Sequence, residues 1–340
     1  MDIRKVQVTG GSSFVITLPK EWAESMHIKK NDPLGVYAQS DGTLLITKNI
    51  TDTQVQRQKR FDTTAISDPQ YLFRLLIASY IAGYSVIQIT NKGRLPPFVR
   101  IVVRDFAQMT IGFEVVEESE SAIILKDLLN PTEMPFDNSV KRMYVIVKNM
   151  YVDAVTALET SNIVLARDVI ARDNDVDRLH WLIARQTNIV LKNPNIARKM
   201  GISTGEVVNT YIICRIIERI GDHAVRVAEN GMKIIEFAAG SRPPGAKTFQ
   251  AIKTVSALSL GVFDRSIVSY FKSDIRSSNQ NIESVDELEN RCGELTAAAG
   301  EEPPEIGIPL RNIAESFRRA GEYAGDISEN VLNHLVEEKI

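Results

Sequence analysis

The residues best placed to do chemistry are pairs of carboxylates spaced four residues apart. Glu218 and Asp222 lie in the stretch ERIGDHAVRVAEN, which has the apolar periodicity of a helix. Four residues are about one helical turn, so both side chains lie on one face. Asp173 and Asp177 form a second pair in the segment 162–192. Clustered carboxylates repel one another unless they are protonated or bridged by a cation, and hard oxygen ligands favour Fe, Mn, Mg or Ca.

Each helix also carries an apolar stripe, which is the face expected to pack in a core. Asp173 and Asp177 lie on the flank of their stripe, whereas Glu218 and Asp222 fall well off theirs. The stripes are formed by Ile213, Ile217, Ile220 and Ala224, and by Leu165, Val169, Val176 and Ile183. If the two helices are neighbours, the four carboxylates can meet in one outer groove. Glu229 and Tyr211 fall on the same side as Glu218 and Asp222.

A solvated helix face explains the same spacing without a metal. Acidic residues on such faces usually pair with basic ones, and the same segment supplies Arg215, Arg219 and Arg226. His223 is expected to be partly buried and hydrogen-bonded, whereas His180, close to both aspartates in sequence, fits either role. Trp181 and Tyr211 fit packing better than base stacking.

The acidic motif has an echo one hundred residues later, in RRAGEYAGDISEN. An ungapped alignment gives five identities: Arg219/Arg319, Gly221/Gly321, Ala224/Ala324, Glu229/Glu329 and Asn230/Asn330. VDRL at 176–179 similarly matches VDEL at 285–288. Two similarities in the same order indicate an internal duplication.

The region from about 134 onward is expected to be helical throughout. Apolar periodicity and breakers predict six helices, at 137–159, 162–192, 205–238, 246–277, 280–299 and 308–338. Short connections favour an antiparallel bundle. GSRPPGA would divide it into two groups of three helices, at 134–240 and 246–340.

Residues 1–50 read as a small β domain, with RKVQVTG and SFVITLP as strands around the turn GGSS. A short helix, KEWAESMHI, and two further strands, LGVYAQS and TLLITK, follow, and DG joins the last two. So short a segment with few apolar residues cannot build a sufficient core alone. It is expected to complete its core against a second copy of the chain.

Residues 51–60, TDTQVQRQKR, are polar and predict a linker. Residues 61–130 then alternate helix and strand and end in a hairpin, GFEVVEES with AIILKDLL, which predicts a small α/β unit. This unit contains no phosphate-binding or dinucleotide-binding glycine pattern, so it suggests no chemistry.

Composition points to a globular protein of several domains without an enzymatic signature. The chain has 340 residues and a net charge of -3, and residues 1–60 hold nine Lys and Arg against six Asp and Glu. This basic head on an acidic body suits an anion such as nucleic acid. The two cysteines predict reduced thiols, and the lack of an apolar leader or span makes the cytoplasm the expected location. Motifs of hydrolases and metalloproteases are missing, so no enzyme is expected.

Residues 4–48 resemble the AbrB/SpoVT/MazE family of swapped-hairpin DNA-binding domains, through the strands ending in Pro-Lys, the IKKND turn and the TLLI strand. The resemblance implies an intertwined homodimer. It places the DNA-contacting residues in the first strands and turn, at Arg4, Lys5, Gln7, Thr9, Ser12, Ser13 and Lys20. The turn usual in that family contains an arginine, which GGSS lacks.

Residues 135–338 resemble the PhoU family, through VIARDNDVDRL and ERIGDHAVRVAEN. The resemblance implies two three-helix repeats and surface metal clusters containing Fe, Mn, Zn or Mg. The resemblance assigns the roles of metal ligands to Asp173, Asp177, Glu218 and Asp222. The second repeat departs from the pattern, because Arg318 and Ile282 occupy the positions of Glu218 and Asp173. A second candidate site would consist of Asp286, Glu322 and Asp326.

The combination of both domains is similar to archaeal phosphate uptake regulators. It implies a DNA-binding transcriptional regulator whose bundle senses a metal, phosphate status or a transporter partner. An adaptor that contacts a phosphate transporter component or a sensor kinase, with the N-terminal domain only dimerising, is the alternative. Toxin neutralisation, as in MazE-type antitoxins, fits the long helical body less well.

Overall fold

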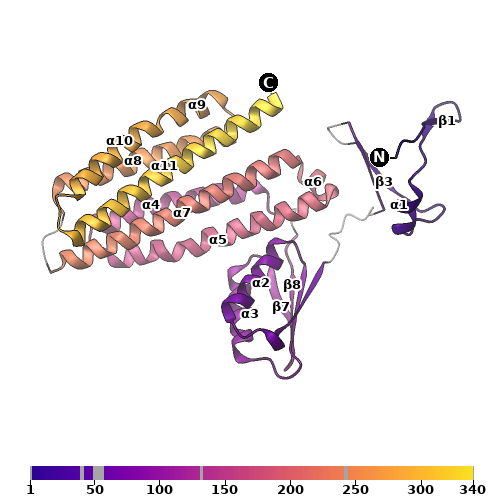
Figure 1. The fold of residues 1–340 in the computed structure, drawn as a ribbon, viewed down its shortest axis with the longest axis horizontal. Coiled ribbons are helices and arrows are strands. Elements are labelled where there is room, and N and C mark those ends of the chain that lie inside the picture. The colour runs from indigo at the N-terminus through magenta and orange to yellow at the C-terminus, as the bar shows by residue number, and fades with distance from the viewer. Residues whose placement is uncertain (1, 39–41, 49–56, 131–132, 241–243, 340) are drawn as a thin grey trace. The chain divides into compact units, whose positions relative to one another are not determined.

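The computed structural model describes residues 2–38, 42–48, 57–130, 133–240 and 244–339, with the side chains of 337–339 left out. It contains two compact units, Met1–Gln54 and Val55–Ile340. The protein is mainly α-helical, with a small β region first and a helical bundle last (Figure 1). The fold class predicted from the sequence is confirmed. Among the described residues, no helix is both long and apolar enough to cross a membrane.

The N-terminal unit consists of two hairpins and a short helix. Strands β1 (Gln7–Thr9) and β2 (Ser13–Val15) pair antiparallel, helix α1 (Lys20–Ser25) follows, and β3 (Gly35–Ala38) pairs with β4 (Leu44–Thr47). Gly10 and Gly11 have φ of 62° and 84°, a region that glycine adopts without steric cost. The GGSS turn therefore depends on its glycines. Asp41 of the predicted DG turn lies outside the described residues.

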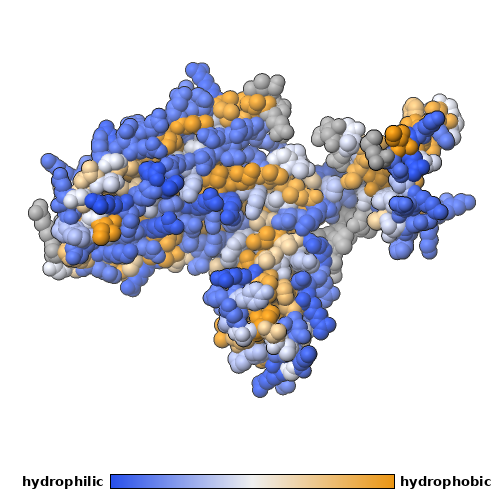
Figure 2. Space-filling view, in the orientation of Figure 1, coloured by the Kyte–Doolittle hydropathy of each residue, from blue (hydrophilic) through white to orange (hydrophobic). Residues whose placement is uncertain are grey.

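No large apolar side chain among the described residues of this unit is fully buried. Phe14 is 79% exposed and Leu44 is 64% exposed. Figure 2 shows such apolar residues, in orange, at the surface of this unit. The expected lack of an internal core is confirmed for this part of the chain.

The α/β unit contains a four-stranded sheet in the order β5-β6-β8-β7. Its strands are β5 (Gln58–Asp62), β6 (Val86–Thr90), β7 (Phe113–Glu118) and β8 (Ala122–Asp127), of which only the β5–β6 pair is parallel. Helices α2 (Pro69–Ile81) and α3 (Pro97–Met109) pack against one face (Figure 1). The predicted β7–β8 hairpin is confirmed.

Strand β5 corrects the expected linker at 51–60. Residues 58–60 belong to the sheet, because β5 pairs with β6 from Gln58 to Asp62. Gln58, Lys59 and Arg60 are exposed at the sheet edge, so the strand lacks the apolar alternation that would reveal it. Residues 51–56 of the expected linker lie outside the described residues.

The first repeat is built from α4 (Phe136–Glu159), α5 (Ile163–Lys192) and α7 (Thr204–Ala238). A short additional helix, α6 (Pro194–Met200), fills the predicted KNPN connection; Asn193 caps it by accepting a hydrogen bond from the Asn195 amide at 3.1 Å. The second repeat is built from α8 (Ala246–Lys272), α10 (Val285–Ala299) and α11 (Pro304–Lys339). Residues 241–243 of the predicted GSRPPGA hinge lie outside the described residues.

The predicted helix at 246–277 is wrong at its end. Helix α8 ends at Lys272 because Ser273 takes a left-handed conformation, with φ of 50°. Asp274 then starts α9 (Ile275–Glu283) by accepting a hydrogen bond from the Ser277 amide at 3.0 Å. The predicted helix at 280–299 is likewise divided, because α9 ends before Ser284 and α10 starts at Val285.

The two repeats share one core, and α7 lies beside α11 at its centre (Figure 1). Gly221 of α7 faces Val147 and Val176, whereas Gly321 of α11 faces Leu288. The shared glycine thus lets the third helix of each repeat approach the preceding helices closely. Cys214 and Cys292 are free and buried in this core, as expected.

The α/β unit is attached to α5 by a buried ion pair. Arg185 donates to Asp127 at 2.5 Å, and these side chains are only 3% and 4% exposed. Arg185 also donates to the Tyr80 carbonyl at 2.6 Å and lies over the Tyr80 and Phe113 rings. A buried pair of charges needs such additional hydrogen bonds to compensate for desolvation.

Candidate functional site

The four carboxylates of the first repeat lie at the junction of α5 and α7. Asp173 and Asp177 project from α5, Glu218 and Asp222 project from α7, and all four are half-buried. The apolar stripes behind them are buried as predicted, apart from the partly exposed Leu165. The Gly221–Val176 approach brings the two helices together at the level of these residues, because a Cβ on Gly221 would lie 3.6 Å from Val176 Cγ1.

The carboxylates act on one another electrostatically. Burial and then the charges of Asp173, Glu218 and Asp222 raise the pKa of Asp177 to about 7. Burial, with Asp222 and Glu229, raises the pKa of Asp173. The pKa of Glu218 is raised by burial and Asp222, although Arg215 opposes the shift. Asp222 has a pKa raised by burial, against the opposing charges of Arg226 and Arg219.

None of these four carboxylates accepts a hydrogen bond or forms an ion pair within the described chain. The neighbouring acids of α5 differ, since Asp168 pairs with Arg172 at 2.8 Å and Asp175 with Arg178 at 3.8 Å. The solvated, arginine-paired face considered from the sequence therefore does not describe these four side chains.

Their side chains do not surround a single point. Among the described residues, no group of three or more His, Cys, Asp or Glu is close enough to hold one metal ion. The donor chemistry suits a hard cation, because four unpaired carboxylates supply oxygen ligands and negative charge. Binding a cation here requires the side chains to converge from the positions they occupy.

The two nearby histidines are buried and neutral. Both ring nitrogens of His180 lack a hydrogen-bond partner in the described residues, and its ring stacks on Tyr211 with centroids 6.3 Å apart. Burial lowers the pKa of His180 to about 4, and that of His223 to about 4 as well. The hydrogen bond expected for His223 is not found at Nδ1, which also lacks a partner there. Trp181 packs edge-on against Phe73, consistent with the packing role expected.

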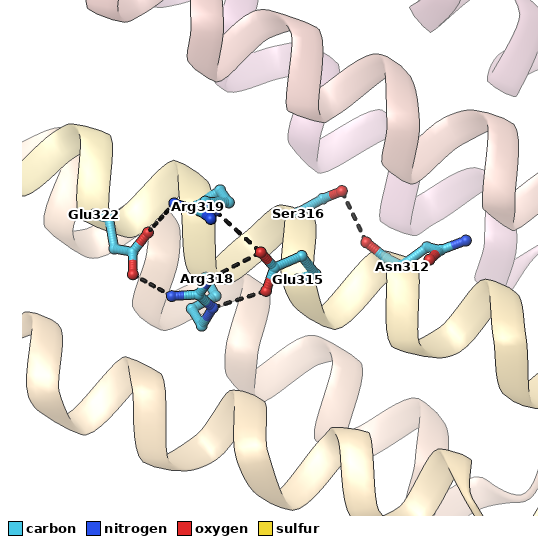
Figure 3. Close-up of polar contacts among 6 residues, drawn as sticks. All are labelled: Asn312, Glu315, Ser316, Arg318, Arg319 and Glu322. Carbon is cyan, nitrogen blue, oxygen red and sulfur yellow. Dashed lines mark hydrogen bonds and ion pairs between the residues drawn. The ribbon is translucent and has the colours of Figure 1, made fainter.

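The second repeat presents a different arrangement at the corresponding place (Figure 3). Arg318, at the position of Glu218, donates to both oxygens of Glu315 at 2.8 Å and also pairs with Glu322. Arg319 adds contacts to Glu315 at 3.0 Å and to Glu322 at 3.3 Å. Two guanidinium groups therefore neutralise Glu322, one of the predicted second-site ligands.

The other predicted second-site ligands are exposed. Asp286 lies in the first turn of α10, and Asp326 lies on α11. Burial raises the pKa of both Glu322 and Asp326, but the additional acidic neighbours are Glu289 for the first and Glu329 for the second. The shared electrostatic field of the first repeat thus has no counterpart among these three side chains.

The candidate DNA-contacting residues are all exposed on the N-terminal unit. Gln7 and Thr9 lie on one face of β1, since alternate strand residues share a face. Ser12 and Ser13 lie at the turn into β2, and Lys20 starts α1. Two of the cations have acidic neighbours, because Arg4 pairs with Asp2 at 3.0 Å and Lys20 with Glu24 at 3.7 Å.

Two stretches of the chain match known protein families. The PhoU domain family matches residues 140–231, and the family "Antidote-toxin recognition MazE, bacterial antitoxin" matches residues 7–53. A relative from Aquifex aeolicus, a phosphate-specific transport system accessory protein PhoU homolog, is 34% identical over 188 residues, which cover 53% of this chain and 80% of the relative. The chain belongs to the PhoU family.

A second PhoU homolog, from Thermotoga maritima, is 21% identical over 201 residues, covering 57% of this chain and 83% of the relative. PhoU from Pseudomonas aeruginosa has a TM-score of 0.51 at 20% identity, over 59% of this chain and 96% of that one. The phosphate transport system regulatory protein PhoU from Streptococcus pneumoniae has a TM-score of 0.50 at 16% identity, over 60% and 95%. These two structures show a shared fold.

The family matches divide the candidate residues unevenly. All four first-repeat carboxylates lie within the PhoU match, whereas the second-repeat candidates lie beyond its end at residue 231. The MazE match begins at residue 7, so it includes Gln7 to Lys20 but not Arg4 or Lys5. Sequence reasoning missed the attachment of α5 to the α/β unit, since only three-dimensional proximity relates Arg185 to Asp127.

Proposed function

We propose that this PhoU-family protein regulates phosphate transport as a dimeric, DNA-binding transcriptional regulator. The observation that carries the proposal is the combination of a PhoU-type bundle with a MazE-like unit whose described residues bury no large apolar side chain fully. The names of the relatives from Aquifex aeolicus and Thermotoga maritima connect this bundle with phosphate-specific transport.

The N-terminal unit is proposed to pair with the same unit of a second chain. Val8 and Phe14 lie directly opposite each other in the β1–β2 hairpin and are 59% and 79% exposed. A pair of apolar side chains contributes to stability when it is removed from water, at roughly 25 cal/mol per Å². A second copy supplies that cover and would place two basic faces on one DNA duplex.

DNA contact is proposed through the exposed Arg4, Lys5, Gln7, Thr9, Ser12, Ser13 and Lys20. Cationic side chains bind phosphates and hold the register, whereas the polar side chains of the strand and turn reach base edges. The N-terminal unit, Met1–Gln54, has six basic and six acidic residues, because Arg57, Lys59 and Arg60 belong to the second unit. Its approach to an anionic duplex would therefore depend on where its cations lie and not on a net positive charge.

The bundle is proposed to bind a divalent cation through Asp173, Asp177, Glu218 and Asp222. Fe, Mn, Zn or Mg would supply positive charge that relieves the repulsion raising these pKa values. The protein side contributes oxygen donors from both α5 and α7, so an occupied site links the two helices. Whether a cation is bound at this site would then be the signal that the bundle passes to the N-terminal unit.

An adaptor that binds proteins but not DNA is the second candidate. GGSS offers no arginine, and the acidic neighbours Asp2 and Glu24 partly satisfy Arg4 and Lys20. In this role the bundle contacts a phosphate transporter component or a sensor kinase, and the N-terminal unit only joins two chains.

A gel-shift titration distinguishes the two roles. The full chain is mixed with duplex DNA from upstream of phosphate-transport genes, at low and at raised salt. DNA binding predicts retardation that weakens steeply with salt. Arg4→Ala/Lys5→Ala should abolish the shift while the dimer persists in light scattering, and Lys29→Ala/Lys30→Ala, which alters two exposed lysines outside the candidate face, should retain it. No retardation, or retardation indifferent to salt, would refute the DNA-binding role and favour the adaptor.

A further inference from the structure

A cavity of about 570 Å³ opens on the α/β unit between α3, β7 and α5. Pockets that bind small molecules typically have volumes of about 300–1,000 Å³. The polar lining comes from Arg100 and Arg104 of α3, Glu114 and Glu118 of β7, and Arg178 of α5. The cavity thus lies between the α/β unit and a helix of the PhoU bundle, and none of the four carboxylates of the α5–α7 junction lines it.

Arg100 is already satisfied by protein acceptors. Its Nε donates to Glu118 at 2.7 Å, and another guanidinium nitrogen donates to the Ser119 carbonyl at 3.1 Å. These contacts neutralise the charge of Glu118 and hold the Arg100 guanidinium at the cavity wall.

Two other arginines retain donors for a ligand. Arg104 forms no hydrogen bond or ion pair with any described residue. It lies one helical turn from Arg100, and two like charges at this spacing destabilise a helix unless an anion lies near them. Arg178 contacts Asp175 only at 3.8 Å, and its Nε lacks an acceptor in the described residues. Planar guanidinium groups match phosphate and carboxylate oxygens in pairs.

The rest of the lining is mixed, because Gln108 and Thr110 add polar groups beside an apolar wall. Val103 and Ile123 are 2% and 1% exposed, and Ala107 and Val115 also line the cavity. One water molecule takes about 30 Å³ of liquid, so a single phosphate ion would leave most of the volume unfilled. The cavity therefore suits a ligand with an organic body as well as an anionic group.

Arg178 is held on a fixed support. It lies seven residues before Arg185 on α5, and residues seven apart share one face of a helix. Arg185 is tied to the α/β unit by its buried pair with Asp127 at 2.5 Å. The two sides of the cavity are consequently joined to one another, which lowers the ordering cost of binding.

We propose that this cavity binds a phosphorylated small organic molecule, with Arg104 and Arg178 holding its phosphate and the apolar wall receiving its body. The α/β unit is then a module that binds an effector. Arg178, which would contact the ligand, directly follows Asp177 on α5. Pairing of Arg104 with Glu114 in solution is the competing explanation for the same charges.

Isothermal titration calorimetry of the full chain tests the proposal, with AMP, ATP, glucose 6-phosphate and inorganic phosphate as probes. EDTA is present so that phosphate cannot bind through a cation on the bundle carboxylates. At least one organic probe is expected to bind with Kd below about 1 mM, and Arg104→Glu should weaken it at least about tenfold. Arg74→Glu makes the same charge change on an exposed residue of α2 outside the cavity and should leave Kd unchanged.

Arg104→Gln, which removes the charge without reversing it, repeats the test if Arg104→Glu loses its helical circular dichroism. Binding of none of the organic probes, or of inorganic phosphate alone, overturns the proposal. Equal weakening by Arg74→Glu also overturns it, because the interaction would then be with net charge and not with the cavity.

Discussion

The charge of Glu218 on α7 acts on Asp177 of α5 across the interface of the two helices. The charge of Glu218 is one of the causes that raise the pKa of Asp177 to about 7, together with burial and Asp173. Neither side chain has a hydrogen-bond or ion-pair partner among the described residues. The bundle therefore holds these carboxylates where binding of a proton or a cation would reduce their repulsion.

The contribution of Asp177 to the stability of the apo protein should fall as pH rises from about 4 to about 7. The pKa of Asp177 is raised from its ordinary 3.8 to about 7 in the folded chain, so in this window the folded state binds more protons than the unfolded state. The Asp177 contribution to the free energy of unfolding then decreases with pH, and its loss is complete above the folded pKa. The lowered pKa values of His180 and His223 act in the opposite direction, so the Asp177 contribution is taken from the difference between the wild type and a variant at this residue. Because the group is partly solvated, Asp177→Asn should recover only roughly 1 kcal/mol above that pKa.

Urea unfolding in EDTA at about pH 5 and about pH 8 measures this effect. Asp175→Asn is the matched control, since this neighbouring acid of α5 pairs with Arg178 and is not one of the four clustered carboxylates. An identical pH dependence in the wild type and in Asp177→Asn would contradict the assignment.

Cation binding should depend on the first repeat and not on the second. Glu218→Ala/Asp222→Ala removes both carboxylates that α7 contributes. Glu322→Ala/Asp326→Ala removes the two candidate acids of α11, which are displaced by one turn from that pair and where Arg318 and Arg319 already neutralise Glu322. At about 100 times Kd, Mn²⁺ should raise the wild-type free energy of unfolding by about 2.7 kcal/mol. The first variant should lose this gain and the second should keep it.

Elemental analysis of protein equilibrated with Fe, Mn, Zn or Mg gives an independent measurement. Equal metal content in the wild type and in Glu218→Ala/Asp222→Ala would exclude the first-repeat site. Equal loss in both double variants would instead show binding by diffuse negative charge.

Dimerisation should depend on the exposed hairpin of the N-terminal unit. Phe14→Asp places a charge where a second copy is expected to cover an apolar pair, so dimer dissociation should become at least about tenfold easier. Tyr71→Asp is the control, because Tyr71 is 52% exposed on α2, outside this unit. Light scattering over a dilution series measures both; a wild-type chain that is monomeric throughout would contradict the prediction.

The sequence predicts this fold best where apolar periodicity governs the structure. The stripes through Ile213 and Val176 predicted which faces of α7 and α5 are buried. The clustering of the four carboxylates was expected on the condition that the two helices are neighbours. Their electrostatic coupling could not be derived from spacing, because it depends on burial and on distances across the interface.

Other features depend on information that periodicity does not carry. Strand β5 was hidden because Lys59 and Arg60 face solvent at a sheet edge. The end of α8 depends on one left-handed residue, Ser273, which has no distinctive sequence signal. The altered chemistry of the second repeat was visible as Arg318, but its pairing with Glu315 and Glu322 required the positions of the side chains.

The shared glycine of the two repeats should tolerate alanine differently. A Cβ at Gly321 would lie 1.9 Å from Leu288 Cδ2, and Leu288 is fully buried. A Cβ at Gly221 would lie 3.3 Å from Val147 Cγ2. Forcing a packed leucine to move costs typically about 1–3 kcal/mol, against a gain of about 1 kcal/mol from better helix propensity. Gly321→Ala should therefore be less stable than Gly221→Ala by at least about 1 kcal/mol.

Gly293 of α10 supplies the control, because it is exposed and a Cβ there would have no neighbour within 4 Å. Gly293→Ala should raise the free energy of unfolding by about 0.5–1 kcal/mol through helix propensity alone. Urea unfolding of the three variants under one condition makes the comparison. If Gly321→Ala proved as stable as Gly293→Ala, the close approach of α11 to Leu288 would not constrain the bundle, and the glycine common to both repeats would need another explanation.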